Sequence, residues 1–465
     1  MASPSQSKPE PLPTQTNTNR LVRYLLIAAL ILLPFSHFRW LPNLGTTRPI
    51  SSVLFVLVIG LIVLNISIQY IHNNGFRLKG LLNLAFLRNR LTTFYGSPIL
   101  LPWIILILLG IISAAFTPLY GNFFQALNRL LGYVIIFATL YCGLYARKIF
   151  SMQQIATYIS LGYLPVLAYG IIEAIATRGI FWAYQIVEWV RSWLVVNFAW
   201  AYRTSYFTTE PSFVGFQLLL LIALMPFLQN RILRLTNMFV ILIALIFSES
   251  GNIFLQVASY FAFLIFFCIK PPVRIWVFGI GVAIVSLVGV WFTWITPFQF
   301  NHYAIYALSV SLNIPRLYSI AISSMIRTSH IRNLIYAMIE TRGLGLGIGQ
   351  YGHFWKEIYL RHFDPLLADP SGEISQTLAS PEYGRPWSVI FGIGVDLGVV
   401  GLLVLLSFFY VIWRSIQTPH SRAILFASIV ALVGAYPIVT PHIWLALALI
   451  AGLPAPKALE TAAEE

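Results

Sequence analysis

Arginines and glycines lie close together in one stretch of the chain, residues 313–352. Arg316 and Arg332 belong to an amphipathic segment, and glycines follow it at every second position from Gly343 to Gly349. A guanidinium group is planar and can hold phosphate oxygens through two parallel hydrogen bonds. Successive backbone N–H groups of glycines can also surround an anion or a sugar. The stretch therefore predicts a site for a phosphate-bearing substrate.

Both halves of this stretch have a plainer interpretation. The arginine-bearing half predicts a helix that starts near Asn313 and stops at Gly343. In an unbroken helix Arg316, Arg327 and His330 share one face, but an interfacial helix whose arginines reach lipid phosphates fits the same pattern. The glycine half lacks the Gly-Lys-Ser/Thr ending of a nucleotide-binding loop. It therefore also fits a tight connector.

The composition is that of a membrane protein. Hydrophobic residues make up 58% of the 465 residues and charged residues only 9%, whereas soluble domains carry far more charge. Apolar runs of about 20 residues are long enough to cross a bilayer as helices. Because the backbone in lipid must bond within its own segment, we expect an all-α polytopic membrane protein.

The apolar runs predict about twelve transmembrane helices, with eleven as the alternative. Ten runs lie near 21–38, 51–70, 98–117, 128–146, 154–176, 212–230, 237–249, 252–269, 275–296 and 387–413. The last run, 423–451, contains Pro437 and Pro441 and predicts two short helices. Basic residues gather in alternate connections, which places that side in the cytoplasm.

These spans divide the chain into segments. The expected order is a disordered cytoplasmic tail at 1–20, nine spans in 21–297 with an outside loop at 177–211, a large helical extracytoplasmic loop at 298–386, three spans in 387–451 and a second cytoplasmic tail at 452–465. The net charge of +14 lies mostly in short loops and not in a basic tract with interleaved aromatics. We therefore expect no nucleic-acid partner.

Three acidic residues suggest chemistry or pairing. Glu210, before Pro211, begins a predicted span and either complements the helix dipole or acts as a base for an acceptor hydroxyl. Glu173 and Asp396 lie within apolar runs, where a charge is costly and faces a cavity or a partner. Asp396 fits equally a helix cap or a pair with an arginine. Since metal-ligand spacing is absent, we predict no metal and no cofactor.

Four motifs carry a resemblance to a known family: RTSYFTTEPSFVGF at 203–216, FSESGN at 247–252, RNLIYAMIETRGLGLGIGQYG at 332–352 and FGIGVDLGVVGLL at 391–403. In layout and in these motifs the chain resembles the O-antigen ligase/polymerase-like membrane proteins, and within them the Wzy-type polysaccharide polymerases. Arg332 and Gly343 match the Arg-x10-Gly spacing of such polymerases, whereas Arg203 and Gly215 miss it by one residue.

The resemblance implies a fold like that of the type-C glycosyltransferases and a metal-independent reaction at the outer face of the bacterial plasma membrane. A glycan would pass from polyprenyl pyrophosphate to a sugar hydroxyl on another lipid-linked unit. Preorganised guanidinium groups stabilise the charge that develops on such a leaving group, and a carboxylate or imidazole takes the proton. The expected pyrophosphate contacts are Arg203, Arg316 and Arg332, with Gly343 and Gly345 as backbone donors; the expected bases are Glu210 and His353.

Two other functions stay open. The ligase branch of the family transfers glycan to a lipid acceptor and has a histidine just before the span after the large loop. The segment PEYGRPWSV at 381–389 has none, which favours a polymerase. A lipid-linked saccharide flippase or other transporter would need charges along a path through many spans. The expected partners are a polyprenyl-pyrophosphate-linked glycan and membrane lipid, with a chain-length regulator among the protein partners of a polymerase.

Overall fold

The computed structural model describes residues 13–35, 49–74, 98–116, 122–194, 206–208, 213–248, 250–270, 272–277, 279–281, 330–362, 386–434 and 440–451. Every regular element in these ranges is a helix, and no strand occurs in them. The all-α class predicted from the composition is confirmed for this part of the chain. The elements with complete bounds are α1 (Pro13–Ile31), α2 (Ile50–Asn74), α5 (Leu101–Phe116), α6 (Phe123–Ile149), α7 (Met152–Ala176), α8 (Phe181–Leu194), α9 (Val214–Leu224), the 3₁₀ turn η3 (Met225–Phe227), α10 (Arg231–Phe247), α11 (Gly251–Cys268), α15 (Tyr351–His362), α17 (Val389–Ser415), α18 (Pro419–Gly434) and α19 (Pro441–Ile450).

Polar side chains mark where several apolar helices begin. The Asn122 side chain accepts the N–H of Gln125 at the start of α6. Ser151 and Gln154 form a reciprocal capping box at the start of α7, and Ser388 accepts the N–H of Phe391 at the start of α17. Because the first N–H groups of a helix have no partner within it, such caps define helix starts that the apolar runs alone leave open.

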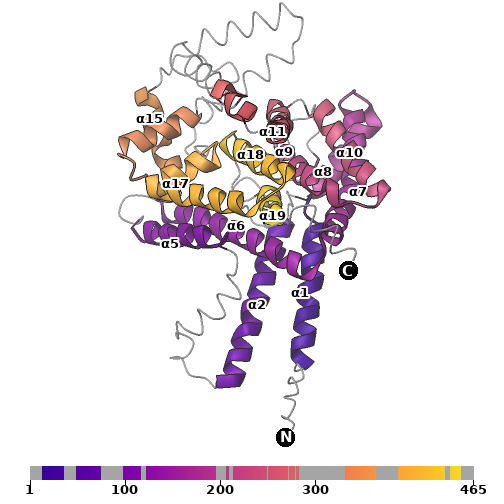
Figure 1. Cartoon of the computed structure of the whole chain (residues 1–465), viewed down its shortest axis with the longest axis horizontal. Coiled ribbons are helices and arrows are strands. Elements are labelled where there is room, and N and C mark those ends of the chain that lie inside the picture. The colour runs from indigo at the N-terminus through magenta and orange to yellow at the C-terminus, as the bar shows by residue number, and fades with distance from the viewer. Residues whose placement is uncertain are drawn as a thin grey trace, which may run out of the picture.

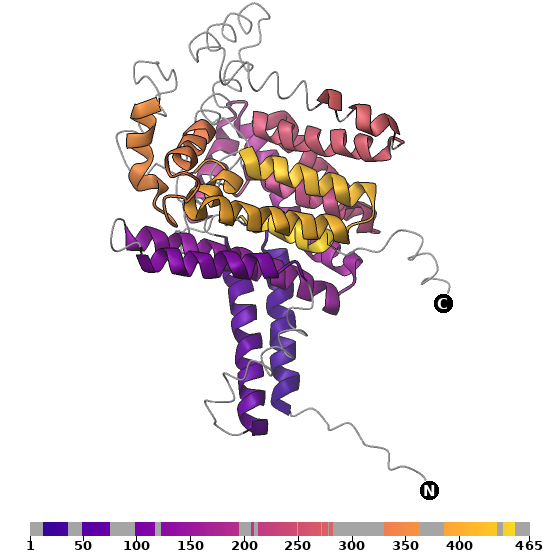
Figure 2. The same cartoon turned by 60° about the vertical axis from the view of Figure 1, so that its left-hand side comes forward.

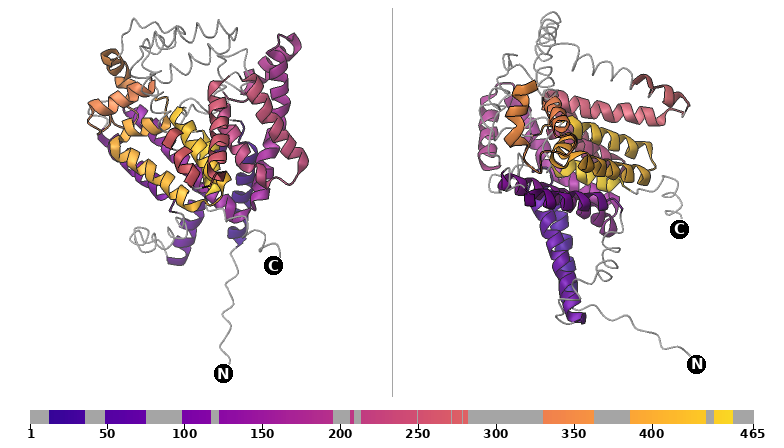
Figure 3. Two further views of the ribbon diagram at one scale, coloured as in Figure 1. Left: turned by 45° about the horizontal axis from the view of Figure 1, so that its top comes forward. Right: turned by 90° about the vertical axis from the view of Figure 1, so that its left-hand side faces the viewer.

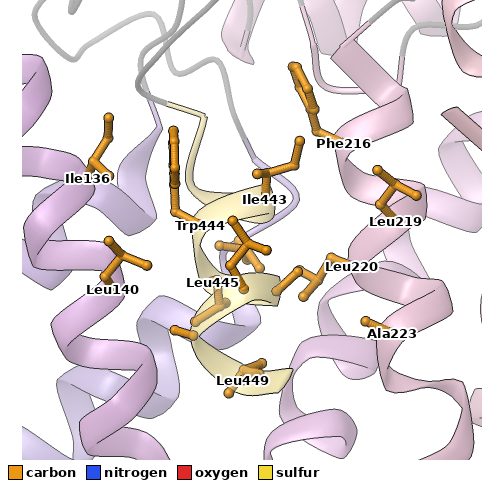
Figure 4. Close-up of a cluster of buried hydrophobic side chains, with 14 of the residues drawn as sticks. Ile136, Leu140, Phe216, Leu219, Leu220, Ala223, Ile443, Trp444, Leu445 and Leu449 are labelled. Carbon is orange, nitrogen blue, oxygen red and sulfur yellow. The ribbon is translucent and has the colours of Figure 1, made fainter. Parts of the chain in front are cut away.

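The core is centred on α19, every residue of which is buried. Figure 4 shows Trp444, Leu445 and Leu449 of this short helix between Ile136 and Leu140 of α6 on one side and residues of α9 on the other. The indole of Trp444 also packs edge-on against Trp103, with ring centroids 5.0 Å apart. A helix that is apolar on all sides is stable only when others surround it, so α19 holds α6 and α9 together.

Around this core the helices pack in hairpins and layers. In Figures 1 and 2, α5 and α6 lie along α17, and α1 and α2 run side by side and project away from the other helices. The upper ends of this pair are anchored because α1 packs on α7 and α2 packs on α6. Figure 3 shows α7, α8 and α10 gathered on the opposite flank from α15 and α17. The segment 330–362 thus lies at one end of α17, away from the α7–α8 hairpin.

The helices are compatible with a membrane-embedded protein. Four of those described are long and apolar enough to cross a bilayer by length and composition: α2, α6, α7 and α17. Further apolar helices of 10–17 residues accompany them. The two short helices expected in 423–451 are confirmed as α18 and α19. The total of about twelve spans stays a prediction.

One predicted boundary is wrong. The helix α1 begins at Pro13, inside the segment 1–20 predicted as a disordered tail. Proline is well suited to a first helical turn, where its missing N–H has no bond to make. The polar residues after it, which suggested disorder, are helical. The segment 177–211, predicted to be an outside loop, begins directly after α7 and contains α8, whose residues Ala183, Val187 and Arg191 are buried. Their spacing of four residues is that of one helix face.

The contact between α1 and α7 depends on a glycine. A Cβ atom added at Gly162 of α7 would lie 2.0 Å from the carbonyl oxygen of Ile31. We expect Gly162→Ala to destabilise the protein by about 1–3 kcal/mol, as overpacking does, and to lower the thermal midpoint measured by size-exclusion chromatography after heating. Gly60→Ala in α2 is the control, because nothing lies within 4 Å of its added Cβ. Equal midpoints for both variants would contradict this packing.

Candidate functional site

The structure places some of the predicted site residues. Arg332, His353, Gly343 and Gly345 belong to the described segment 330–362. Arg203, Glu210 and Arg316 lie outside the described residues, so their predicted roles stay predictions. The site is therefore built from the segment 330–362 and from the membrane helices that hold it.

Two helices of this segment pack against each other. Residues 330–340 are helical, and α15 follows after the glycines. Asn333 is fully buried between them and donates to the hydroxyl of Tyr351 (2.9 Å) and to the carbonyl of Trp355 (3.3 Å). At the other end, Glu340 accepts from Arg361 at 2.7 Å and contacts the His362 ring at 2.6 Å. The two helices form one small folded unit.

Arg332 lies at the border of this unit. Its side chain is half-buried, and its neighbour Asn333 belongs to the buried face. His353, the second predicted base, lies in the first turn of α15 and is exposed. Its ring packs edge-on against Phe354, and no carboxylate in the described part of the chain bonds to it. A carboxylate that orients the imidazole for proton transfer is thus missing from these residues.

The helix 330–340 ends in a Schellman motif. The N–H of Gly343 donates to the carbonyl of Met338 (2.8 Å), and the N–H of Arg342 donates to that of Ile339 (2.9 Å). This pattern places Arg342 at the position that usually holds a left-handed glycine, and its φ is +53°. The predicted stop near Gly343 is confirmed. The first residue with left-handed backbone angles at this helix end is Arg342.

The glycine run is a tight connector. All four glycines have positive φ, from +71° to +95°, which L-residues with a side chain rarely adopt. The N–H of Gly345 donates to Thr341 Oγ1, that of Ile348 to Ser113 Oγ, and that of Gly349 to Asp396 Oδ1. With the N–H of Gly343 bonded to Met338, both predicted backbone donors, Gly343 and Gly345, are occupied within the chain. The structure therefore favours the connector over an anion cradle.

The connector closes a break in α17. At Gly398 the helix has non-helical angles, φ +69° and ψ −166°, which frees backbone groups on either side. The N–H of Leu346 donates to Val395 O (2.7 Å), and the N–H of Val399 donates to Gly343 O (2.8 Å). Backbone groups in an apolar surrounding cost free energy unless they are bonded. The connector thus supplies the hydrogen bonds that the broken helix lacks.

Close approach of two backbones explains these glycines. An added Cβ at Gly345 would lie 2.6 Å from Gly398 N, and one at Gly398 would lie 2.4 Å from Gly343 O. No side chain fits at either position. Of the alternating glycines that suggested a ligand cradle, Gly343 and Gly345 are required by contact with α17, and Gly349 by its approach to the backbone of Gln125 in α6.

Asp396 binds the connector to two helices. Its Oδ1 accepts the N–H of Gly349 (3.0 Å), while its Oδ2 accepts from Arg129 Nε (2.6 Å) and from the Tyr133 hydroxyl (3.1 Å) of α6. The carboxylate and the guanidinium are both buried. The arginine pairing considered for Asp396 is present, with a partner 267 positions earlier in the chain.

Glu173 makes a second junction of the same kind on the other flank. Its Oε1 accepts from Arg191 of α8 (3.0 Å), and its Oε2 accepts the backbone N–H of Tyr206 (2.8 Å). The Tyr206 hydroxyl donates to Val240 O (2.6 Å), and burial raises the pKa of this phenol, so it stays protonated. Residues 206–208, between the predicted site residues Arg203 and Glu210, are thereby fixed to α7 and α10.

Each buried acid therefore joins an arginine of a helix to a backbone N–H of a segment predicted to lie outside. The place of both acids in apolar runs predicted that each faces a cavity or a partner. The sequence alone did not single out Arg129, Arg191 or Gly398. Arg129 lies inside the apolar run 128–146, which is itself a signal, because such a charge needs a partner. In the described part of the chain, no three or more His, Cys, Asp and Glu side chains are grouped as a metal site would require.

Comparison with known proteins adds no assignment. No family model matches the chain, and no curated protein matches it.

The Asp396 junction predicts a stability effect. Asp396→Asn removes the charge opposite Arg129 in a buried setting, and breaking such a pair from one side costs about 3–5 kcal/mol. We expect a lower thermal midpoint of the purified protein. The double variant Arg129→Met/Asp396→Leu should recover part of the loss, because no buried charge is then left alone. A midpoint of Asp396→Asn equal to that of the parent would rule out this role.

The Glu173 junction offers a matched pair of variants. Glu173→Gln leaves Arg191 without its counter-charge, and we expect a loss of about 3–5 kcal/mol. Glu188→Gln, on the exposed face of α8, should change stability by no more than about 0.5 kcal/mol. Limited proteolysis near Tyr206 should become faster only in the first variant. Equal behaviour of the two variants would show that the pair does not hold this segment.

Proposed function

We propose that the chain is a membrane glycosyltransferase that polymerises lipid-linked polysaccharide repeat units. It would act at the outer face of a bacterial plasma membrane. The glycan would move from polyprenyl pyrophosphate to a sugar hydroxyl on a second lipid-linked unit. The sequence motifs suggest this reaction, and the structure supports it through the way in which the helix that carries Arg332 is held.

The observation that carries the proposal is the anchoring of the Arg332 helix. A Schellman turn, the glycine connector and Asp396 tie this helix to α17 and α6 by a continuous set of hydrogen bonds. Preorganised cations lower an activation barrier more than mobile ones, because they need no rearrangement as charge develops. A guanidinium group on a fixed helix suits a diphosphate leaving group.

The proposed reaction is a substitution at the anomeric carbon of the donor. The acceptor hydroxyl oxygen forms the new glycosidic bond while the bond from that carbon to the pyrophosphate oxygen breaks. The leaving polyprenyl pyrophosphate keeps the electron pair, and Arg332, with Arg203 and Arg316, would balance its charge. The hydroxyl proton passes to Glu210 or, as the second choice, to His353. No metal or cofactor takes part in this scheme.

A ligase is the alternative within the same chemistry, since only the acceptor differs. A transporter of lipid-linked saccharide is the candidate from another class. The break of α17 at Gly398 favours it, because interrupted helices occur at transporter binding sites. Against it, Asp396 and Glu173 are each bonded to an arginine and to a backbone N–H. They do not present an unpaired charge along a path.

Purified full-length protein with synthetic pyrophosphate-linked repeat units separates these functions. Growth of oligomers on the lipid would support a polymerase, and transfer only to an added lipid acceptor would support a ligase. In sealed vesicles, movement of the labelled saccharide across the bilayer without any new glycosidic bond would support the transporter and refute the proposed reaction.

The role of Arg332 gives the sharpest variant. We expect Arg332→Ala to lower the rate of oligomer growth by about 100-fold or more, as loss of one charge-stabilising donor does, and to remove long chains from a chain-length gel. Arg361→Ala is the control, because this exposed arginine lies in the same pair of helices and bonds to Glu340. A normal ladder from a folded Arg332→Ala protein would remove Arg332 from the site.

A further inference from the structure

Two non-glycine residues in the described part of the chain have positive φ: Tyr206 at +50° and Arg342 at +53°. A residue with a Cβ adopts this conformation at a cost in free energy, and it persists where other interactions require it. For Tyr206 these interactions are visible, since its N–H bonds to Glu173 and its hydroxyl to Val240. Arg342 is strained in the same way, so an interaction of its side chain should account for its positive φ.

No partner within the described chain supplies that reason. Arg342 is exposed, and no hydrogen bond or ion pair of its side chain occurs among the described residues. The nearby Arg361, by contrast, bonds to Glu340. A cation at a helix C-terminus does complement the helix dipole. Residues of the last helical turn can provide that effect without positive φ, so the dipole does not explain an arginine at the left-handed position.

The surroundings of Arg342 are apolar and exposed. Ile339, one turn before it, is 60% exposed, and Leu344, two residues after it, is 83% exposed. The connector at Gly343 lies against Val399 of α17, where Val400 is also exposed. A cation without a bonded partner among the described residues thus lies at the edge of an apolar surface that continues onto α17.

We propose that Arg342 binds the phosphate group of a membrane phospholipid, with the lipid's acyl chains on the apolar surface formed by Ile339, Leu344, Val399 and Val400. A guanidinium group holds phosphate oxygens in a bidentate manner, and a basic residue bordered by apolar side chains suits the boundary between headgroups and acyl chains. The apolar neighbours select a lipid over a free anion. This site does not depend on the proposed reaction.

The test uses the full-length protein in detergent, titrated with phosphatidylglycerol and monitored by native mass spectrometry. We expect Arg342→Gly to raise the dissociation constant of the tightest bound lipid about fivefold, the effect of one basic residue near a lipid headgroup. Arg342→Lys should retain most of the binding. Lys356→Ala is the control for loss of one positive charge, because Lys356 is exposed on α15 and should leave lipid binding unchanged.

A thermal midpoint of Arg342→Gly equal to or above that of the parent is also expected, because glycine relieves the backbone strain. A lower midpoint would show that the arginine serves the fold and would overturn the proposal. So would unchanged lipid binding in Arg342→Gly, or an equal loss in Lys356→Ala. Displacement of the lipid by inorganic phosphate at the same concentration would show a simple anion site and refute the lipid assignment.

Discussion

Two buried carboxylates hold the polar segments of this protein to its apolar helices. Asp396 and Glu173 each use one oxygen for an arginine of a helix and the other for a backbone N–H of a connecting segment. An isolated charge in such a setting is strongly disfavoured, but a charge that is paired and fully hydrogen-bonded is tolerated. Removing one partner leaves the other buried, so each junction is formed as a unit or not at all.

The two junctions lie on different flanks and serve different segments. The Asp396 junction positions the connector after the Arg332 helix, and the Glu173 junction positions residues 206–208. Both segments come from regions of the sequence that carry arginines suited to a diphosphate. A rigid attachment to α17 and α6 gives Arg332 a fixed place, which the proposed recognition of a lipid-linked phosphate would use.

The broken helix α17 and the glycine connector depend on each other. Gly398 interrupts the helix, and Gly343 and Gly345 allow the connector to approach closely enough to bond to the freed backbone groups. Neither element satisfies its backbone alone in an apolar surrounding. Gly343 and Gly345 are thus packing requirements. The polar chemistry of the segment belongs to its side chains, among them the half-buried Arg332 and the strained Arg342.

Composition and the length of the apolar runs were enough to predict the helical class, most helix positions and the need for partners at Glu173 and Asp396. The reason is that burying an unbonded backbone group or an unpaired charge costs free energy wherever it occurs in a chain. Which arginine meets which acid was decided only by the tertiary structure, since 267 positions separate Asp396 from Arg129. The same holds for the glycines: their spacing is compatible with a ligand cradle and with a connector. The contact with Gly398, which no local pattern encodes, decides between them.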